Sequence, residues 1–595
     1  MYNVEDRGNP SQTGGIFLLS RLDQKKGIEM IITDALRHPV QWRAGMAAAA
    51  LVAASLASGT VAGAPAASAQ SSNSVLHIEA SPTGPISNNF NPFLSTSPAV
   101  LLGASDMVYE PLFQYNFAKP GEMVPWLATS YRFSDGDRTL TFTLRKGVKW
   151  SDGTAFTSKD VAFTFDMLKA NPALNGLGVT FTSVAAPNPY TVVMHFASPA
   201  YVQLYNIAGG TPIVQAHQWS GVKDPATFSD SNPIGTGPYV LQSMNARGIT
   251  LVRNPHYWQP GEPKVDELSY LVFDSNTSAN TALEAGQLDW AGNFVPHIQQ
   301  LYKQRDPSQR FYEFVPYRTT VIVLNLTRYP FNLLPVRKAL SMALNRPAVV
   351  NAGEYGEQPA ALTPTGLVLP AQDSLLAPEY KDLGYKTDVA GALKLLLKAG
   401  FKKGSGGKLL EPDGKPFAFT LIGPTPYTDV MADDQVIAQQ WDALGAQVTV
   451  SGEAVGSWID QTDTGNYDVS LTAPGSAEIV DPYGAFNEYL NSDLAAPIGK
   501  TSVGDVEHFE SPSTDRLLAD WASATTSQGR QAALDGIEKV MVQQLPVIPL
   551  FYNVYFCEWT TNHFVGWPSP KDPYNVPEPA GSEAEMVVLH LRPVK

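Results

Sequence analysis

The chain has 595 residues, of which 44% are hydrophobic and 16% charged, and this composition excludes a disordered or fibrous protein. Its formal net charge is -15 and it has no basic block, so nucleic acid is not an expected partner. The single cysteine, Cys557, excludes an intrachain disulfide.

Residues 1–69 have the pattern of an N-terminal extension followed by a secretory signal peptide. Basic residues within 37–43 precede an alanine-rich apolar run at 46–57, and small residues lead from there to Ala67-Ser68-Ala69. The run is shorter than the roughly 20 residues that a membrane-spanning helix needs. We therefore expect cleavage before Gln70 and export to the periplasm or the extracellular space, with an uncleaved anchor helix as the alternative.

After residue 74, strand and helix patterns alternate as in an α/β protein, and the clearest local unit spans 127–168. Apolar residues alternate with threonines across 139–144, which predicts a half-buried strand. Asp152-Gly153 predicts a turn, and Thr157 stands three residues before Asp160, the spacing of a helix capping box. The block therefore predicts a strand, a turn and a capped helix.

The rest of the chain continues this alternation and ends in a proline-rich segment. Apolar residues at helical spacing and glycine stop signals mark further helices, and glycine-rich stretches mark loops. The proline-rich segment at 565–579 predicts an extended, irregular loop. The other predicted elements are helices at 336–345, 387–399 and 433–444, a strand at 446–450 and an exposed hairpin or loop at 402–416.

The sequence carries none of the motifs that would indicate catalysis or a bound metal. G-x-S-x-G, H-E-x-x-H and paired cysteines are absent. Gly499-Lys500-Thr501 looks like the end of a phosphate loop, but Leu494 stands where that motif needs its first glycine. We therefore expect no cofactor, no metal site and no enzymatic activity. An exported hydrolase is the alternative of another class.

Residues 127–165 resemble the signature of family 5 extracellular solute-binding proteins, the dipeptide- and oligopeptide-binding class of ABC importers. The resemblance covers the alternating strand, Arg145-Lys146-Gly147, the Asp152-Gly153 turn and the Thr157 cap. Further matches follow in the order of the family and cover nearly all of the chain beyond the leader. They are PIGTGPY at 233–239, RNPHYW at 253–258, EAGQLD at 284–289, VRKAL at 336–340 and LPVIPL at 545–550.

The resemblance implies a two-lobed α/β fold of the periplasmic-binding-protein type, with an extra subdomain in the large lobe and the ligand cleft between the lobes. The large lobe would comprise about 75–322 plus 551–595, with the extra subdomain at about 108–232. The small lobe would comprise about 323–550. Strands near 317–325 and 549–556 would form the hinge.

The implied function is to capture short peptides by hinge closure and to deliver them to the permease subunits of an ABC importer. We expect a monomer, held at the membrane by the transporter complex, since no cysteine near the cleavage site offers a lipid anchor. One alternative is an oligosaccharide-binding protein of the same family, for cello- or xylo-type ligands. Another is a sensor that signals through a membrane partner.

Two further resemblances suggest ligand-binding residues, and the aromatic residues Trp458 and Tyr109, the latter in the large-lobe segment 108–110, are candidates beside them. Residues 477–482 are similar to the family segment whose aspartate holds the α-amino group of a peptide; Glu478, or Asp481 in a register shifted by three, would take that role. Residues 481–500 and 565–569 resemble the branch that includes oligosaccharide binders, where aromatic faces stack on sugar rings. The full set of candidates is Tyr109, Trp458, Glu478, Asp481, Tyr483 and Trp567.

Overall fold

The computed structural model describes residues 74–81, 83–119, 121–475, 479 and 482–594. The predicted leader at 1–69 and the candidates Glu478 and Asp481 lie outside these residues. The described chain is a two-lobed, mixed α/β fold organised around a ten-stranded sheet, with a separate four-stranded sheet beside it.

The ten-stranded sheet has the order β16-β15-β17-β12-β18-β11-β1-β10-β9-β8. Its strands are β1 (Val75–Glu79), β8 (Tyr239–Asn245), β9 (Gly248–Arg253), β10 (Glu267–Leu271), β11 (Trp290–Ala291), β12 (Arg310–Leu324), β15 (Ala418–Pro424), β16 (Gln447–Glu453), β17 (Val469–Thr472) and β18 (Val547–Thr560).

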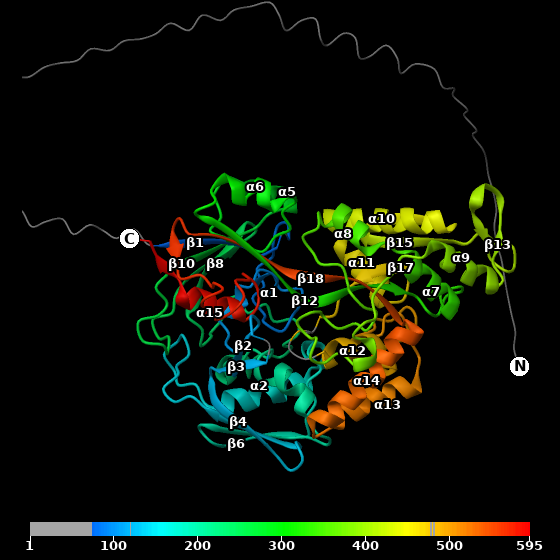
Figure 1. Cartoon of the computed structure of the whole chain (residues 1–595). Coiled ribbons are helices and arrows are strands. Elements are labelled where there is room, and N and C mark those ends of the chain that lie inside the picture. Colours follow the sequence, from blue (N-terminus) through cyan, green and yellow to red (C-terminus); the bar gives the residue numbers. More distant parts are fainter. Residues whose placement is uncertain (1–73, 82, 120, 476–478, 480–481, 595) are drawn as a thin grey trace, which may run out of the picture. The chain divides into compact units, whose positions relative to one another are not determined.

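Two long antiparallel strands, β12 and β18, carry the chain from one half of this sheet to the other (Figure 1). Strand β18 pairs with β11 near Trp559, and β12 pairs with β17 from Val321 onward. Their mutual register shifts near Pro316 and again near Val321, so the ladder is interrupted where the strands pass between the halves. We call the part built on β11, β1, β10, β9 and β8 the β1 side, and the part built on β17, β15 and β16 the β15 side.

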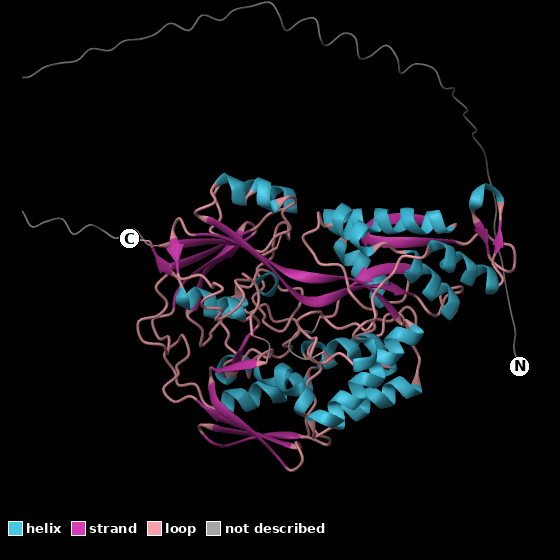
Figure 2. Ribbon diagram, viewed as in Figure 1, coloured by secondary structure: helices cyan, strands magenta, loops and turns pink. Residues whose placement is uncertain are grey.

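The β15 side holds most of the longer helices (Figure 2). Strand β15 runs parallel to both β16 and β17, and parallel strands need long, here helical, connections. The helices are α7 (Leu334–Ala343), α8 (Arg346–Gly353), α9 (Val389–Lys398), α10 (Thr428–Leu444), α11 (Val455–Asp463), α12 (Tyr483–Leu490), α13 (Pro512–Ser523) and α14 (Ser527–Gln544).

The predicted elements of the β15 side are confirmed with small shifts in their ends. Helix α10 begins at Thr428, five residues before the predicted start, and has Asp429 in its first turn. It ends at Gly445, whose φ of 111° is accessible to glycine and strained for other residues. The predicted hairpin at 402–416 contains a short antiparallel pair, β13 (Lys402–Lys403) and β14 (Leu409–Leu410).

The predicted strand, turn and capped helix at 127–168 are confirmed as β5 and α2. The backbone N–H of Thr157 donates to the Asp160 carboxylate at 2.8 Å, and the full capping box is formed. Strand β5 lies in the four-stranded sheet β4-β5-β7-β6, which α2 contacts. The elements of this region are β2 (Phe113–Asn116), β3 (Glu122–Pro125), β4 (Ala128–Ser134), β5 (Thr139–Leu144), α2 (Ser158–Ala170), β6 (Ser183–Asn188), β7 (Thr191–His195), α3 (Leu204–Ala208) and α4 (Ala216–Trp219).

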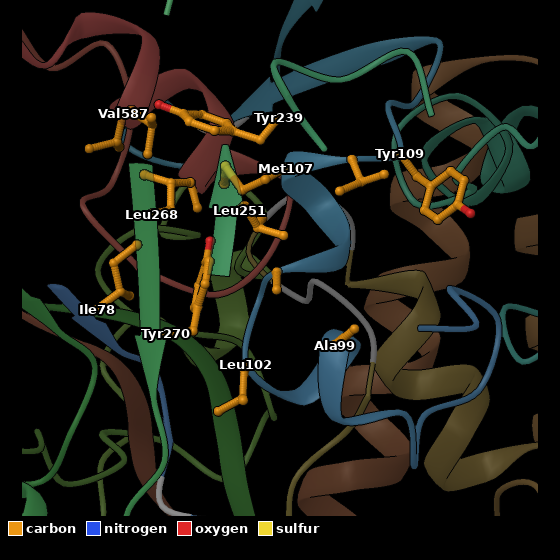
Figure 3. Close-up of a cluster of buried hydrophobic side chains, with 14 of the residues drawn as sticks. Ile78, Ala99, Leu102, Met107, Tyr109, Tyr239, Leu251, Leu268, Tyr270 and Val587 are labelled. Carbon is orange, nitrogen blue, oxygen red and sulfur yellow. The ribbon is translucent and has the colours of Figure 1, made fainter. Parts of the chain in front are cut away.

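The core of the β1 side combines segments from both ends of the described chain. Ile78 of β1, Leu268 of β10 and Val587 of α15 are fully buried in one cluster, which Figure 3 shows. The first strand and the last helix therefore stabilise each other across the chain. The remaining elements on this side are α1 (Pro98–Leu101), α5 (Asn276–Glu284), α6 (Ile298–Leu301), β19 (Phe564–Val565), α15 (Glu583–His590) and β20 (Arg592–Pro593). Among the described residues, no helix has the length and apolar character required to cross a membrane.

Candidate ligand cavity

A cavity of about 420 Å³ lies beside the interrupted middle of β12, where the two sides meet. Its volume is in the range of small-molecule binding sites. Both sides contribute: β12 supplies Val315 and Pro316, the β15 side supplies Leu369, and the proline-rich loop supplies Pro568. The full lining is Phe117, Ala118, Glu313, Val315, Pro316, Leu369, Pro370, Ala371, Ile479, Pro568, Ser569, Pro570, Pro573, Asn575 and Val576.

The walls of the cavity are mainly apolar, and Glu313 is the charged side chain among the lining residues. Glu313 is exposed at the edge of the cavity, and partial burial raises the pKa of its carboxyl above the ordinary value. Among the described residues, its carboxylate has no hydrogen-bond or ion-pair partner in the protein. Glu313 is therefore available to a ligand.

Asn575 also lines the cavity, but its side-chain amide is already hydrogen-bonded to backbone groups. Its amide oxygen accepts from the N–H groups of Phe117 and Val576, both at 2.9 Å, and its amide nitrogen donates to the carbonyl of Tyr115 at 2.9 Å. This network ties the proline-rich loop to the end of β2. Asn575 thus shapes the wall, and Glu313 carries the charge.

The proline-rich loop forms one wall of the cavity, and the protein fixes it at several points. The indole N–H of Trp290 donates to the carbonyl of Pro577 at 2.7 Å. The ring of Tyr574 stacks on His590 with centroids 3.9 Å apart. The predicted irregular loop is confirmed, and these contacts hold it in place as a preformed surface.

Buried carboxyl groups lie behind Glu313. Cys557 lies opposite Glu313 in the β12–β18 register, and its Sγ is 3.8 Å from a carboxylate oxygen of Glu578. Burial raises the pKa of Glu578 well above the ordinary value, and the neighbouring Glu583 adds repulsion. Burial raises the pKa of Glu583 itself to about 8. Burial therefore favours the protonated, uncharged form of both carboxyls, and Glu313 carries the charge on this side of the cavity.

The four described candidates from the sequence lie outside the lining of this cavity. Tyr109 is 1% exposed and belongs to the buried cluster that Figure 3 shows, and its hydroxyl donates to Asp230. Trp458 is half-buried, and its indole N–H donates to the hydroxyl of Ser470 at 2.8 Å. Tyr483 begins α12, with its ring 5.5 Å from that of Trp521.

Trp567 supports the cavity wall from behind. It is 9% exposed, its indole N–H donates to the carbonyl of Phe564 at 3.1 Å, and its ring lies 5.5 Å from that of Trp290. Its neighbour Pro568 lines the cavity. Ile479, which lies in sequence between the undescribed candidates Glu478 and Asp481, lines it as well.

Three parts of the lining were not predicted from the sequence: Glu313, Phe117 and the turn at 369–371. A signal for Glu313 does exist, since it is a lone acidic residue within the run RFYEFV at 310–315. Phe117 and residues 369–371 carry no such signal, because they differ in no local way from other loop residues.

Comparison with known proteins agrees with this architecture. Residues 122–495 match the family described as bacterial extracellular solute-binding proteins, family 5 Middle. A nickel-binding periplasmic protein of Escherichia coli (strain K12) is 31% identical over 61% of this chain and 68% of its own length. A di/tripeptide-binding protein of Pseudomonas aeruginosa (strain UCBPP-PA14) is 27% identical over 82% of this chain and 90% of its own length.

Solved structures share the whole fold. A periplasmic oligopeptide-binding protein of Thermotoga maritima, solved with mannohexaose, is 25% identical with a TM-score of 0.79, covering 88% of this chain and 99% of that one. The oligopeptide-binding protein AppA of Bacillus subtilis, solved with a nonapeptide, is 19% identical with a TM-score of 0.72 over the same shares. The chain therefore belongs to the family 5 extracellular solute-binding proteins and has their two-lobed fold.

Proposed function

We propose that this protein is the extracytoplasmic solute-binding component of an ABC importer, and that it captures short peptides and hands them to the membrane permease. The observation that carries the proposal is the mainly apolar cavity, edged by the carboxylate of Glu313, where the two sides meet. A ligand there contacts both sides at once, so closure around it is favoured over the open state.

The lobes divide as the family resemblance implies. The large lobe comprises about 75–322 plus 551–595, with an extra subdomain at about 108–232, and the small lobe comprises about 323–550. The shared core of β1 and α15 supports a large lobe built from both chain ends. The interrupted pairing of β12 and β18 supports a hinge at these strands.

A peptide fits the cavity better than an oligosaccharide does. Sugars present many hydroxyl groups, and their binding sites combine polar side chains with several aromatic faces. Here Phe117 is the aromatic side chain among the described lining residues, and the side-chain amide of Asn575 is already engaged. Under the sugar alternative, the aromatic candidates Tyr109, Trp458, Tyr483 and Trp567 would carry the binding.

The nickel-binding relative raises a metal ligand as another possibility. The described residues contain no group of three or more His, Cys, Asp or Glu side chains that could hold a metal ion. A bare cation is therefore not the proposed ligand. Glu478, or Asp481 in the register shifted by three, is proposed to bind the amino end of the peptide.

The remaining parts of the proposal concern location and assembly. Residues 1–69 direct export and are cleaved, the protein acts as a monomer, and the transporter retains it at the membrane. It binds its solute without converting it. Turnover of a peptide or a chromogenic glycoside by the pure protein would instead support a hydrolase.

A thermal-shift screen tests the proposed function. The protein is unfolded and refolded to remove carried-over ligand, then heated with di- to pentapeptides and with cello-, xylo- and malto-oligosaccharides. A ligand present at about a thousand times its Kd adds about 4 kcal/mol to the free energy of unfolding. Stabilisation by peptides supports the proposal, whereas stabilisation by sugars alone contradicts it.

A further inference from the structure

We propose that the ligand is a mainly apolar molecule that carries an ammonium group, and that Glu313 binds this ammonium group. This proposal rests on the proposed function, because it assigns ligand chemistry to the same cavity. Glu313, on strand β12, is a second carboxylate for ligand ammonium groups, in addition to Glu478 or Asp481 in the segment that the family resemblance singled out.

The position of Glu313 on β12 directs its side chain to the cavity. Residues two apart on a strand point to the same face, and Val315 of that face lines the cavity. The register shift of β12 and β18 begins beyond Pro316, so the alternation from Glu313 to Val315 is undisturbed. The strand thus holds a carboxylate at the edge of an apolar chamber.

The surrounding charges select the sign of the ligand group. No Lys, Arg or His is among the described lining residues, so none of them offers an ion-pair partner to an anionic ligand group. Such a group would also be repelled by the carboxylate of Glu313. An ammonium would donate charge-assisted hydrogen bonds to a carboxylate that has no partner among the described residues.

The walls select the rest of the ligand. Phe117, Val315 and Leu369 present apolar surface, and the prolines of the 568–573 loop offer no N–H donors. An apolar chain gains by leaving water for such a site, whereas a densely hydroxylated one would lose hydrogen bonds. The two features together describe a short peptide of apolar residues with a free amine.

A direct test compares two probe mixtures on the wild type and on Glu313→Gln. The first is an equimolar set of tripeptides of Ala, Leu, Phe and Lys, and the second is the same set with every amine acetylated. Binding is measured by native mass spectrometry on the refolded, ligand-free protein. Glu510→Gln, at an exposed glutamate outside the cavity lining, serves as the matched control.

We expect acetylation to weaken wild-type binding by about 10- to 100-fold, the scale of a hydrogen bond to a charged group. Glu313→Gln should weaken binding of the free-amine mixture to a similar degree and leave binding of the acetylated mixture unchanged. Tight binding of free-amine peptides that is insensitive to Glu313→Gln would overturn this inference and leave the proposed function intact. Failure of both mixtures to bind the wild type would overturn the proposed function and the inference with it.

Discussion

The guanidinium of Arg530 on α14 lies over the ring of Tyr201, with 4.0 Å between the guanidinium carbon and the ring centroid. Tyr201 belongs to a short 3-10 helix (Tyr201–Gln203) beside the four-stranded sheet, and its neighbour Val202 packs against the core of the β15 side. The contact therefore joins segments from the two proposed lobes. In a protein that closes by a hinge, such a contact forms in the closed state and breaks on opening.

Replacing Arg530 with alanine should speed ligand release. An exposed cation–π contact contributes about 0.5–1 kcal/mol, so its loss should weaken affinity by roughly 2- to 5-fold. Stopped-flow measurement of the dissociation rate checks this. Arg516→Ala, at an exposed arginine of α13, is the control and should release ligand at the wild-type rate. An unchanged rate in Arg530→Ala would mean that the contact does not hold the closed state.

The buried carboxyl pair of Glu110 and Glu585 predicts that two substitutions of Glu585 will differ in their effect on stability. The indole N–H groups of Trp126 and Trp258 both donate to one oxygen of Glu110 at 2.8 Å, and Glu585 bonds to the same carboxylate. Burial first, and then the charge of Glu110, raises the pKa of Glu585 well above its ordinary value. Burial of the pair therefore favours the protonated form of Glu585, which can then donate a hydrogen bond to Glu110.

Glu585→Gln should be tolerated, because the glutamine amide also donates and carries no charge. Glu585→Leu removes the partner of Glu110 and of Gln114, whose amide donates to Glu585 at 2.8 Å. We expect a loss of about 2–4 kcal/mol for leucine and less than about 1.5 kcal/mol for glutamine. Urea unfolding at pH 7 measures both, and equal losses would show that Glu585 is not the donor.

Capped helix ends were predicted well from the sequence because they depend on residues close together in the chain. The cavity, which combines residues far apart in the chain, was not predicted. The capped helix α2 follows from Thr157 and Asp160, whose bonds form within one turn. The end of α10 follows from Gly445 for the same reason. The cavity instead combines residues near 117, 313, 370 and 570, and only the folded chain brings these segments together.

The aromatic candidates show a second limit of sequence reasoning. An aromatic side chain suits a core as well as a cleft, and its polar atom needs a partner in both places. In the structure, Tyr109 donates to Asp230 and Trp567 donates to the carbonyl of Phe564, so each polar atom has a partner within the protein. Residue type does not distinguish these environments.

Gly235 in the PIGTGPY segment packs so closely against the backbone that a larger residue there should destabilise the fold. A Cβ on Gly235 would lie 1.8 Å from the carbonyl oxygen of Val108, and the carbonyl of Gly235 accepts the N–H of Ser151 at 2.9 Å. Gly235→Ala must therefore displace backbone, and we expect a loss of about 3 kcal/mol or failure to fold. Gly221→Ala is the control, since a Cβ there meets no atom within 4 Å. Equal urea midpoints for the two variants would contradict the close approach.

Buried carboxyl groups predict how stability changes with pH. Glu79 on β1 is 0% exposed, both of its carboxylate oxygens lack a hydrogen-bond partner among the described residues, and burial raises its pKa to about 8. It lies in register with Ala291 of β11, which in turn lies opposite Glu558 of β18. Burial raises the pKa of Glu558 well above its ordinary value too. Both groups are therefore held in the protonated form by the folded chain.

Because these folded-state pKa values exceed those of the unfolded chain, the folded state binds more protons between about pH 4.5 and pH 8. The stability that this provides is complete below the unfolded pKa and is lost as the pH rises through the folded pKa. For Glu79 alone, the loss between pH 4.5 and pH 7 is on the order of 3 kcal/mol. Urea unfolding at intervals from pH 5.5 to pH 8 should show a falling free energy of unfolding. This range lies above the one in which Asp152 and Asp289, whose pKa values are lowered, take up protons.

Glu79→Gln isolates the contribution of Glu79 to the pH dependence of stability. The amide cannot ionise, so the variant should lose less stability than the wild type between pH 5.5 and pH 8. Glu510→Gln, at an exposed glutamate, should keep the wild-type slope. If Glu79→Gln and the wild type lose stability in parallel, Glu79 does not stay protonated in the folded chain, and the pH dependence must come from other buried carboxyls such as Glu583.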